Sequence, residues 1–292
     1  MFADTSLARG IEAAEARLTR AAAQTIRTRD PSSLVVELGA GVAVASGEGS
    51  PIDKVIGIGF EPLDWPAFDR FEHEALALGR SVRVELATLA DPTIARTLTS
   101  RGFELQGFEN LLGRRLDAGR ASRDAGECEV AVVDRAGGGL EAWIETINTG
   151  FLHPDVYDGP PPPDESFDRD VLQRVLRDMT TVPGFVQVIA RRGGNVAGGA
   201  SMRIDGDIAQ LTGAATLPEH RRRGVQSALL ARRLTLAADA GCGVAVVTTA
   251  PGSKSQQNVM RAGFSLLYAR AVLVKAPTCE FAGPAIPRRA SP

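Results

Sequence analysis

The sequence predicts an α/β protein with a mixed sheet, long enough for two domains of common size. Strand-like runs rich in β-branched residues alternate with helical patterns along most of the 292 residues. A short helix that ends in Gly-Phe and leads into a strand occurs twice, at Gly102-Phe103 and at Gly263-Phe264. Glycine commonly ends helices, so a chance match is the alternative to an internal repeat.

The N-terminal part is predicted to open with a helix and then to alternate strands and helices. Pro31 ends the first helix, Pro66 lies near the start of the second, and Asp91-Pro92 caps the third. The expected helices span residues 11–26, 63–78 and 91–100, and the expected strands span residues 34–38, 42–45, 55–60, 82–86 and 108–116.

The C-terminal part is predicted to follow the order β α α β β β α β α β. Glycine turns separate its first strands, and Pro218 stops further sheet pairing because it has no N–H to donate. Four consecutive prolines, residues 160–163, exclude helix and sheet and favour an extended segment. The expected strands span residues 130–134, 185–191, 196–204, 208–217, 244–249 and 265–275, and the expected helices span residues 140–151, 166–179, 225–240 and 254–262.

Composition excludes several classes of function. The net charge of −2 argues against a nucleic-acid binder. Three widely spaced cysteines and three histidines match neither a disulfide framework nor a metal-ligand spacing, so we expect no metal. The apolar run of a signal peptide is absent, and no stretch is apolar enough to span a membrane. We therefore expect a cytoplasmic protein.

The most informative stretch joins the strand at residues 208–217 to the long helix that follows. Three arginines, Arg221, Arg222 and Arg223, stand directly before Gly224 and the first turn of that helix. The N–H groups of a first helical turn have no intrahelical partner and attract anions, and arginine binds phosphate oxygens in a bidentate way. The stretch therefore predicts a pyrophosphate site, with a solvated helix start as the alternative. It lacks the glycines of a dinucleotide loop and the Gly-Lys-Ser/Thr of a Walker loop.

At these residues the chain resembles the GNAT superfamily of acyl-CoA-dependent N-acyltransferases. Its Arg/Gln-x-x-Gly-x-Gly/Ala signature corresponds to residues 221–226, with Gln226 in place of the last small residue. Residues 215–220 resemble the usual approach to this loop. The resemblance implies acetyl-CoA as cosubstrate, bound between two splayed strands. The cofactor residues that it implies are Ala215, Thr216, Leu217, Arg221, Arg222, Arg223, Gly224, Val225, Gln226, Ser227 and Asn258.

The resemblance also implies a tandem of two GNAT-like domains. Residues 128–276 form the acetyl-CoA-binding domain, after a linker at residues 119–127. Residues 1–118, with the leading helix, form a degenerate domain that has no Arg-x-x-Gly loop. We expect residues 277–292 to be a disordered tail.

The catalytic groups are less clear than the cofactor site. The tyrosine that serves as general acid in the family is replaced by Val259, and the strand at residues 208–217 carries no carboxylate. No Ser-His-Asp or Cys-His arrangement suggests a covalent intermediate, so direct attack by an amine fits better. Asn258, near the thiol position, and Thr248, through a water, are the candidate catalytic residues. His153 and Tyr157 are candidates for recognition of the acceptor.

Two functions follow from these observations. The first is transfer of an acetyl group to a primary amine of a small molecule or peptide, by a monomer or homodimer. The alternative is a non-catalytic acyl-CoA-binding or sensor protein, which the missing tyrosine favours.

Overall fold

The computed structural model describes residues 1–47, 49–116, 128–154 and 168–277. The helices are α1 (Thr5–Arg29), α2 (Trp65–Ala77), α3 (Pro92–Ser100), α4 (Gly139–Leu152), α5 (Arg169–Met179), α6 (Val225–Asp239) and α7 (Lys254–Arg261), with a 3₁₀ turn, η1, at Pro218–His220. The strands are β1 (Leu34–Leu38), β2 (Gly41–Ala45), β3 (Val55–Ile56), β4 (Val82–Ala87), β5 (Glu104–Arg115), β6 (Cys128–Val132), β7 (Phe185–Arg192), β8 (Asn195–Asp205), β9 (Ile208–Thr216), β10 (Val244–Thr249) and β11 (Ser265–Lys275).

Most predicted elements are confirmed to within a few residues. Asp91 caps α3 by accepting a hydrogen bond from the Thr93 amide, with Pro92 in the first turn as expected. The strand expected at residues 55–60 is wrong in length, because β3 ends at Ile56 and Gly57 takes a positive φ of 77°. The predicted linker and tail, and the four prolines, lie outside the described residues.

All eleven strands form one sheet, in the order β1-β2-β3-β4-β11-β5-β10-β9-β8-β7-β6. We call residues 1–116 the N-terminal half and residues 128–276 the C-terminal half. The last strand of each half lies in the other half: β11 pairs antiparallel with β4, and β5 pairs antiparallel with β10. The two exchanged strands, β5 and β11, also pair with each other over most of their length. The halves are therefore joined through backbone hydrogen bonds as well as side chains.

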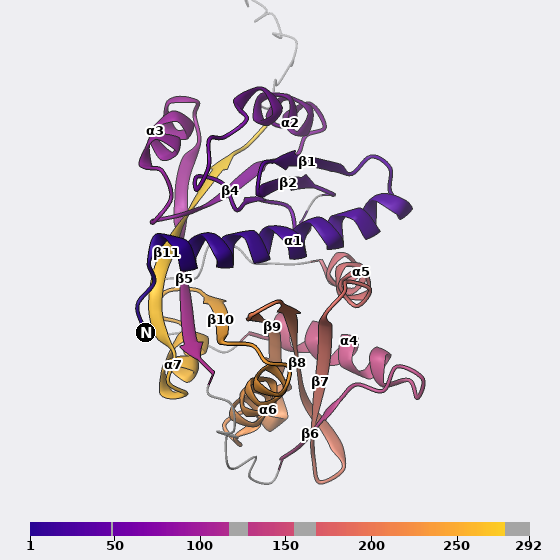
Figure 1. Cartoon of the computed structure of the whole chain (residues 1–292). Helices are drawn as coiled ribbons and strands as arrows, with labels where there is room; N and C mark the ends of the chain where they lie inside the picture. The colour runs from indigo at the N-terminus through magenta and orange to yellow at the C-terminus, as the bar shows by residue number, and fades with distance from the viewer. Residues whose placement is uncertain (48, 117–127, 155–167, 278–292) are drawn as a thin grey trace, which may run out of the picture.

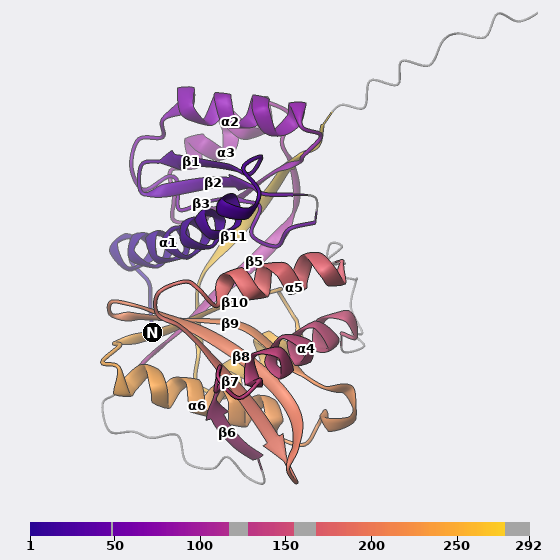
Figure 2. The ribbon, with the colours of Figure 1, turned by 90° about the vertical axis from the view of Figure 1, so that its right-hand side faces the viewer.

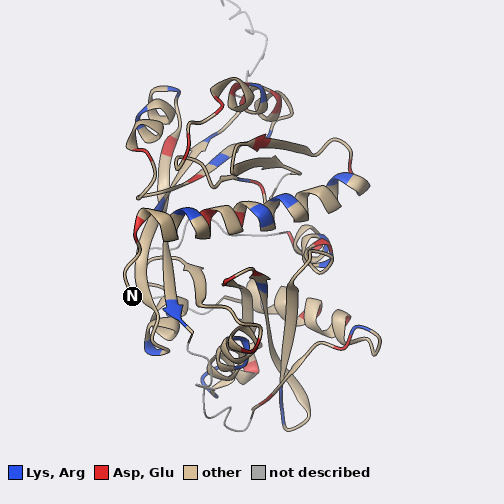
Figure 3. Ribbon diagram, in the orientation of Figure 1, with Lys and Arg blue, Asp and Glu red and all other residues tan. Residues whose placement is uncertain are grey.

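Helix α1 runs across the middle of the molecule, between the strands of the N-terminal half and helix α5 of the C-terminal half (Figures 1 and 2). Its acidic residues, Glu12 and Glu15, lie in its first half, and only basic residues follow from Arg17 to its end (Figure 3). Ion pairs join α1 to the C-terminal half, among them Arg17 to Asp205 and Arg29 to Asp178. In the C-terminal half, α4 and α6 cover opposite faces of β8, since Trp143 lies over Gly199 and Val225 lies over Gly198.

None of the described helices is long and apolar enough to cross a membrane.

A buried ion pair connects α1 to the exchanged strand β11. The Nε of Arg270 donates to Oε1 of Glu12 at 2.8 Å, and both side chains are only 1% exposed. The hydroxyl of Tyr268 donates to the same carboxylate oxygen at 2.7 Å. Burial opposes the charge on Arg270, but Glu12, Glu15 and Glu85 raise its pKa well above the usual value. The guanidinium therefore stays charged inside the protein.

We predict that Arg270→Met destabilises the fold by about 3–5 kcal/mol, because it leaves a buried carboxylate without a cation. Urea unfolding followed by circular dichroism measures the change. Arg177→Met is the matched control, since the Arg177–Glu141 pair has side chains 44% and 58% exposed. It should cost less than about 1 kcal/mol. Equal losses in the two variants would contradict this prediction.

Candidate functional site

Strands β9 and β10 separate part-way along their length. They pair in parallel from Ile208–Val244 to Leu211–Val247. Beyond that point both strands continue, but they no longer pair with each other. On its other side β9 remains paired with β8 up to Thr216. The backbone groups of residues 212–216 are therefore unpaired on the side that faces β10. An extended molecule can bind such an edge by hydrogen bonds, as a neighbouring strand would.

A bulge interrupts β9 next to the point of separation. The register of β8 and β9 shifts between Ala200–Ala214 and Ser201–Thr212, which leaves Gly213 unpaired. The buried Arg233 of α6 lies behind this bulge and donates to the carbonyl oxygens of Ser201 and Thr212, at 3.0 and 3.2 Å. Burial lowers the pKa of Arg233 to about 10, so the side chain stays charged at neutral pH. It holds the bulge in place and polarises the peptide group that Thr212 shares with Gly213.

The basic loop after β9 leads into α6 without a side-chain cap. The Ncap residue of α6 is Gly224, with φ of 80°, and no side chain in the described residues caps this helix start. Arg222 has φ of 60°, a left-handed conformation that costs about 1–2 kcal/mol for a residue other than glycine. Arg222 and Arg223 are exposed. The loop thus has free first-turn amides and exposed cations at one place, as an anion site requires.

The predicted cofactor residues other than Asn258 lie along this path. Ala215 and Thr216 end β9, Leu217 follows them, and the arginines stand between η1 and α6. The hydroxyl Oγ1 of Thr216 is buried and has no hydrogen-bond partner among the described residues. The guanidinium of Arg221 donates to the carbonyl oxygen of His153 at the end of α4. His153, predicted for the acceptor, therefore lies beside the basic loop.

The other predicted site residues fall in different places. Thr248 lines the point where β9 and β10 separate, whereas Asn258 lies on α7 and its Oδ1 accepts a bond from Arg261. Val259, at the position of the family's tyrosine, is buried in the core between α6 and α7. Burial raises the pKa of the Tyr268 phenol, so that hydroxyl stays protonated. Tyr157 lies outside the described residues.

A cavity of about 330 Å³ opens where the two strands part. We call it the central cavity. Its strand side is formed by Leu211, Thr212 and Gly213 of β9 and by residues 246–248 of β10. Its other side carries charged groups that the sequence did not single out. These are Glu15 of α1, Lys54 before β3, Glu109 of β5 and Arg270 of β11.

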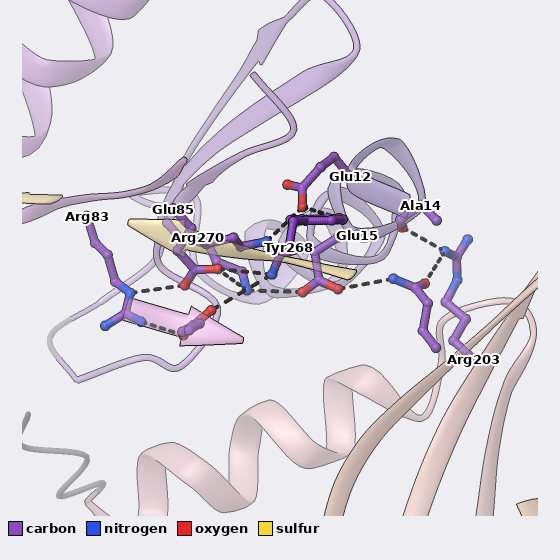
Figure 4. A network of polar contacts seen from close by, with 11 residues as sticks. Glu12, Ala14, Glu15, Arg83, Glu85, Arg203, Tyr268 and Arg270 are labelled. Carbon is purple, nitrogen blue, oxygen red and sulfur yellow. Dashed lines mark hydrogen bonds and ion pairs between the residues drawn. The ribbon is translucent and has the colours of Figure 1, made fainter. Parts of the chain in front are cut away.

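The charged groups form one continuous network (Figure 4). Lys54 bridges Glu15 and Glu85, with Nζ–O distances of 3.1 and 3.2 Å. Glu15 uses its second oxygen to accept a bond from the side-chain amide of Gln210 at 3.1 Å. Arg83 bridges Glu85 and Glu109 at 3.0 and 2.9 Å. The network therefore runs from β4 of the N-terminal half to β9 of the C-terminal half.

The carboxylates of this network differ in how easily they hold a proton. Burial opposes ionisation of Glu85, but Lys54 and Arg270 overcome it and lower its pKa to about 2. Burial raises the pKa of Glu109, and the neighbouring Glu85 raises it further. Of the two carboxylates that line the cavity, Glu109 therefore has the raised pKa, whereas Lys54 and Arg270 overcome burial and lower the pKa of Glu15. Among the described residues no group of three or more His, Cys, Asp and Glu has the arrangement of a metal site.

The N-terminal half has a helix start at the corresponding place, but it is blocked. Asp64 caps α2 by accepting a bond from the Ala67 amide at 2.9 Å, and Pro66 in the first turn has no N–H. The cap adds a negative charge where an anion would bind. This helix start is unsuited to a pyrophosphate.

The model of the acetyltransferase (GNAT) family matches residues 151–264. The chain carries a GNAT domain. The match runs from the end of α4 through α7 and includes the basic loop.

Solved structures of other proteins match almost the whole chain. The GCN5-related N-acetyltransferase from Kribbella flavida is 20% identical, with a TM-score of 0.59, over 91% of this chain and 97% of that one. A tandem GNAT protein from the clavulanic acid biosynthesis pathway is 13% identical, with a TM-score of 0.59, over 92% and 96%. No match was found among curated proteins. At this identity the structures establish the fold, a tandem of two GNAT-like units.

Two substitutions in the basic loop should change stability in opposite directions. A Cβ at Gly224 would meet no atom within 4 Å, so Gly224→Ala adds only the strain of its positive φ. We expect a loss of about 1–2 kcal/mol. Arg222→Gly removes such strain at the cost of greater freedom in the unfolded chain. Its net effect should lie between zero and a gain of about 1 kcal/mol. Thermal unfolding measures both, and a clear loss in Arg222→Gly would show that this backbone is not strained.

Proposed function

We propose that the protein is an acyl-CoA-dependent N-acetyltransferase that transfers acetyl from acetyl-CoA to a primary amine. The observation that carries this proposal is the continuity of the site. The separated edge of β9 leads from the central cavity to the basic loop and the uncapped start of α6. Only one of the two halves offers this path, because Asp64 caps the corresponding helix α2. Buried free thiols at Cys128 and Cys242 fit a reducing compartment and support a cytoplasmic location.

The path fits the parts of acetyl-CoA in order. The amides of residues 222–227 and the Arg222 and Arg223 side chains would hold the pyrophosphate. The pantetheine arm would extend along residues 213–217, which span about 13 Å at ~3.3 Å per residue. Its amides can pair with the β9 edge, and the unpartnered hydroxyl of Thr216 offers one more hydrogen bond. The acetyl group would then reach Gly213 and the central cavity.

Direct transfer needs a neutral amine, a polarised carbonyl and a protonated leaving group. The amine nitrogen attacks the thioester carbon, the C–N bond forms, and the C–S bond breaks. The unpaired backbone at Gly213, polarised by Arg233, is placed to stabilise the oxyanion. The departing thiolate takes a proton, and the nitrogen loses one. In this proposal a water ordered by Thr248 takes the proton from nitrogen and passes it to sulfur, and Asn258 donates a hydrogen bond to the sulfur.

A second function, a non-catalytic acyl-CoA sensor, is favoured by one observation. Val259 replaces the family's tyrosine and is buried, so the position offers no proton donor. Release of free CoA thiol in the presence of an amine, with formation of the amide, distinguishes the enzyme from the sensor.

We expect acetyl-CoA to bind the protein in the micromolar range by isothermal titration calorimetry. Arg222→Glu/Arg223→Glu should weaken binding at least about 100-fold, because two charge-assisted contacts become repulsions. Arg70→Glu/Arg96→Glu is the control, with the same change in charge at exposed positions on α2 and α3. It should bind like the unmodified protein. No binding by the unmodified protein would refute the enzyme and the sensor together.

A further inference from the structure

The central cavity contains an imbalance of charge that points to its ligand. Four carboxylates, Glu12, Glu15, Glu85 and Glu109, share three cations, Lys54, Arg83 and Arg270. With every group ionised, the cluster has one negative charge too many. Because the group is mostly buried, that charge is costly unless a proton or a cation joins it. Burial raises the pKa of both Glu12 and Glu109, and the neighbouring Glu85 raises that of Glu109 further.

Glu109 also has a carboxylate oxygen that is available to a ligand. Its Oε1 accepts a bond from Arg83 at 2.9 Å, whereas its Oε2 lies 3.9 Å from Arg270 Nη1, which is too far for a hydrogen bond. In contrast, Glu15 accepts bonds on both oxygens, from Lys54 and Gln210. An ammonium group entering the cavity would therefore pair with Glu109.

One residue that lines the cavity also has a donor without an acceptor. Arg270 is 1% exposed, and no described residue accepts a hydrogen bond from its Nη2. Buried donors are nearly always paired in folded proteins, so this atom awaits an acceptor. A neutral oxygen suits it better than a carboxylate, because the cluster already has an excess of negative charge. The ligand thus needs a positive end and a neutral oxygen.

We propose that the central cavity is the acceptor site, and that it takes a small primary amine with a single positive charge and a neutral hydroxyl or carbonyl oxygen. This inference rests on the proposed acetyltransferase function. Glu109, contributed by the exchanged strand β5, binds the ammonium and accepts its proton. The neutral amine then attacks the acetyl carbon, and a second proton passes from the nitrogen to the CoA thiolate as the C–S bond breaks. The proton on Glu109 returns to solvent.

The test begins with acetyl-CoA binding, which examines the proposed function alone. Four linear amines of similar size then examine the acceptor site: aminobutanol, pentylamine, diaminobutane and aminobutanoate. Each is titrated into the CoA-bound protein, and each is assayed for acetylation. Shorter and longer amino alcohols are tested as well, because the chain length sets the distance between nitrogen and oxygen. We expect the best amino alcohol to surpass pentylamine by at least about tenfold in both assays, the worth of one hydrogen bond to a charged donor.

Equal use of pentylamine, or a preference for the diamine, the amino acid or a peptide N-terminus, would overturn the assignment of this ligand. In each of these outcomes acetyl-CoA binding would still stand. If acetyl-CoA itself fails to bind, the proposed function and the acceptor site both fall.

Glu109→Gln tests the proton acceptor. We expect kcat/KM to fall by about 10²–10⁴, with CoA affinity unchanged as evidence of correct folding. In the unmodified protein kcat/KM should rise with pH through the raised pKa of Glu109, because only the carboxylate accepts a proton. The variant should lose this step of the profile. Glu104→Gln, an exposed position on the same strand, is the control and should keep it. An unchanged profile in Glu109→Gln would overturn the assignment.

Discussion

The exchange of the last strands, β5 and β11, is the constraint on which the rest of the structure depends. It places a residue of β11, Arg270, against a residue of α1, Glu12, that lies 258 positions away in the sequence. Because the pair is buried, neither partner is stable without the other. The same exchange inserts Glu109 beside the opening of β9 and β10. The strand exchange therefore determines both the stability of the protein and which residues line its site.

The two halves show how one fold can keep or lose an anion site through a few residues at a helix start. In the C-terminal half, Gly224 and three arginines leave the first amides of α6 free. In the N-terminal half, Asp64 and Pro66 occupy or remove the equivalent donors of α2. We infer that the N-terminal half binds no cofactor of its own. It completes the site of the C-terminal half, since it supplies Lys54 and Glu109 to the central cavity.

Local signals in the sequence predicted the elements and the cofactor loop. Asp91-Pro92 marked the start of α3, and Arg221 to Gly224 marked the start of α6, because caps and loops depend on neighbours in the chain. The exchange was not predicted, since antiparallel pairing depends on backbone groups, and β5 and β11 have the same pattern whichever neighbour they join. For this reason Glu15, Glu109 and Arg270 were missed, although each lies in an element that was predicted.

The most direct test of this account divides the chain within residues 117–127. The central claim is that both halves build one site. Residues 128–292 expressed alone lack β5 and the partner of β11, and we expect them to bind no acetyl-CoA. Co-expression with the N-terminal fragment should restore a one-to-one complex with the affinity of the whole chain. If residues 128–292 alone bind acetyl-CoA as tightly as the intact protein, the exchange is dispensable and the claim is wrong.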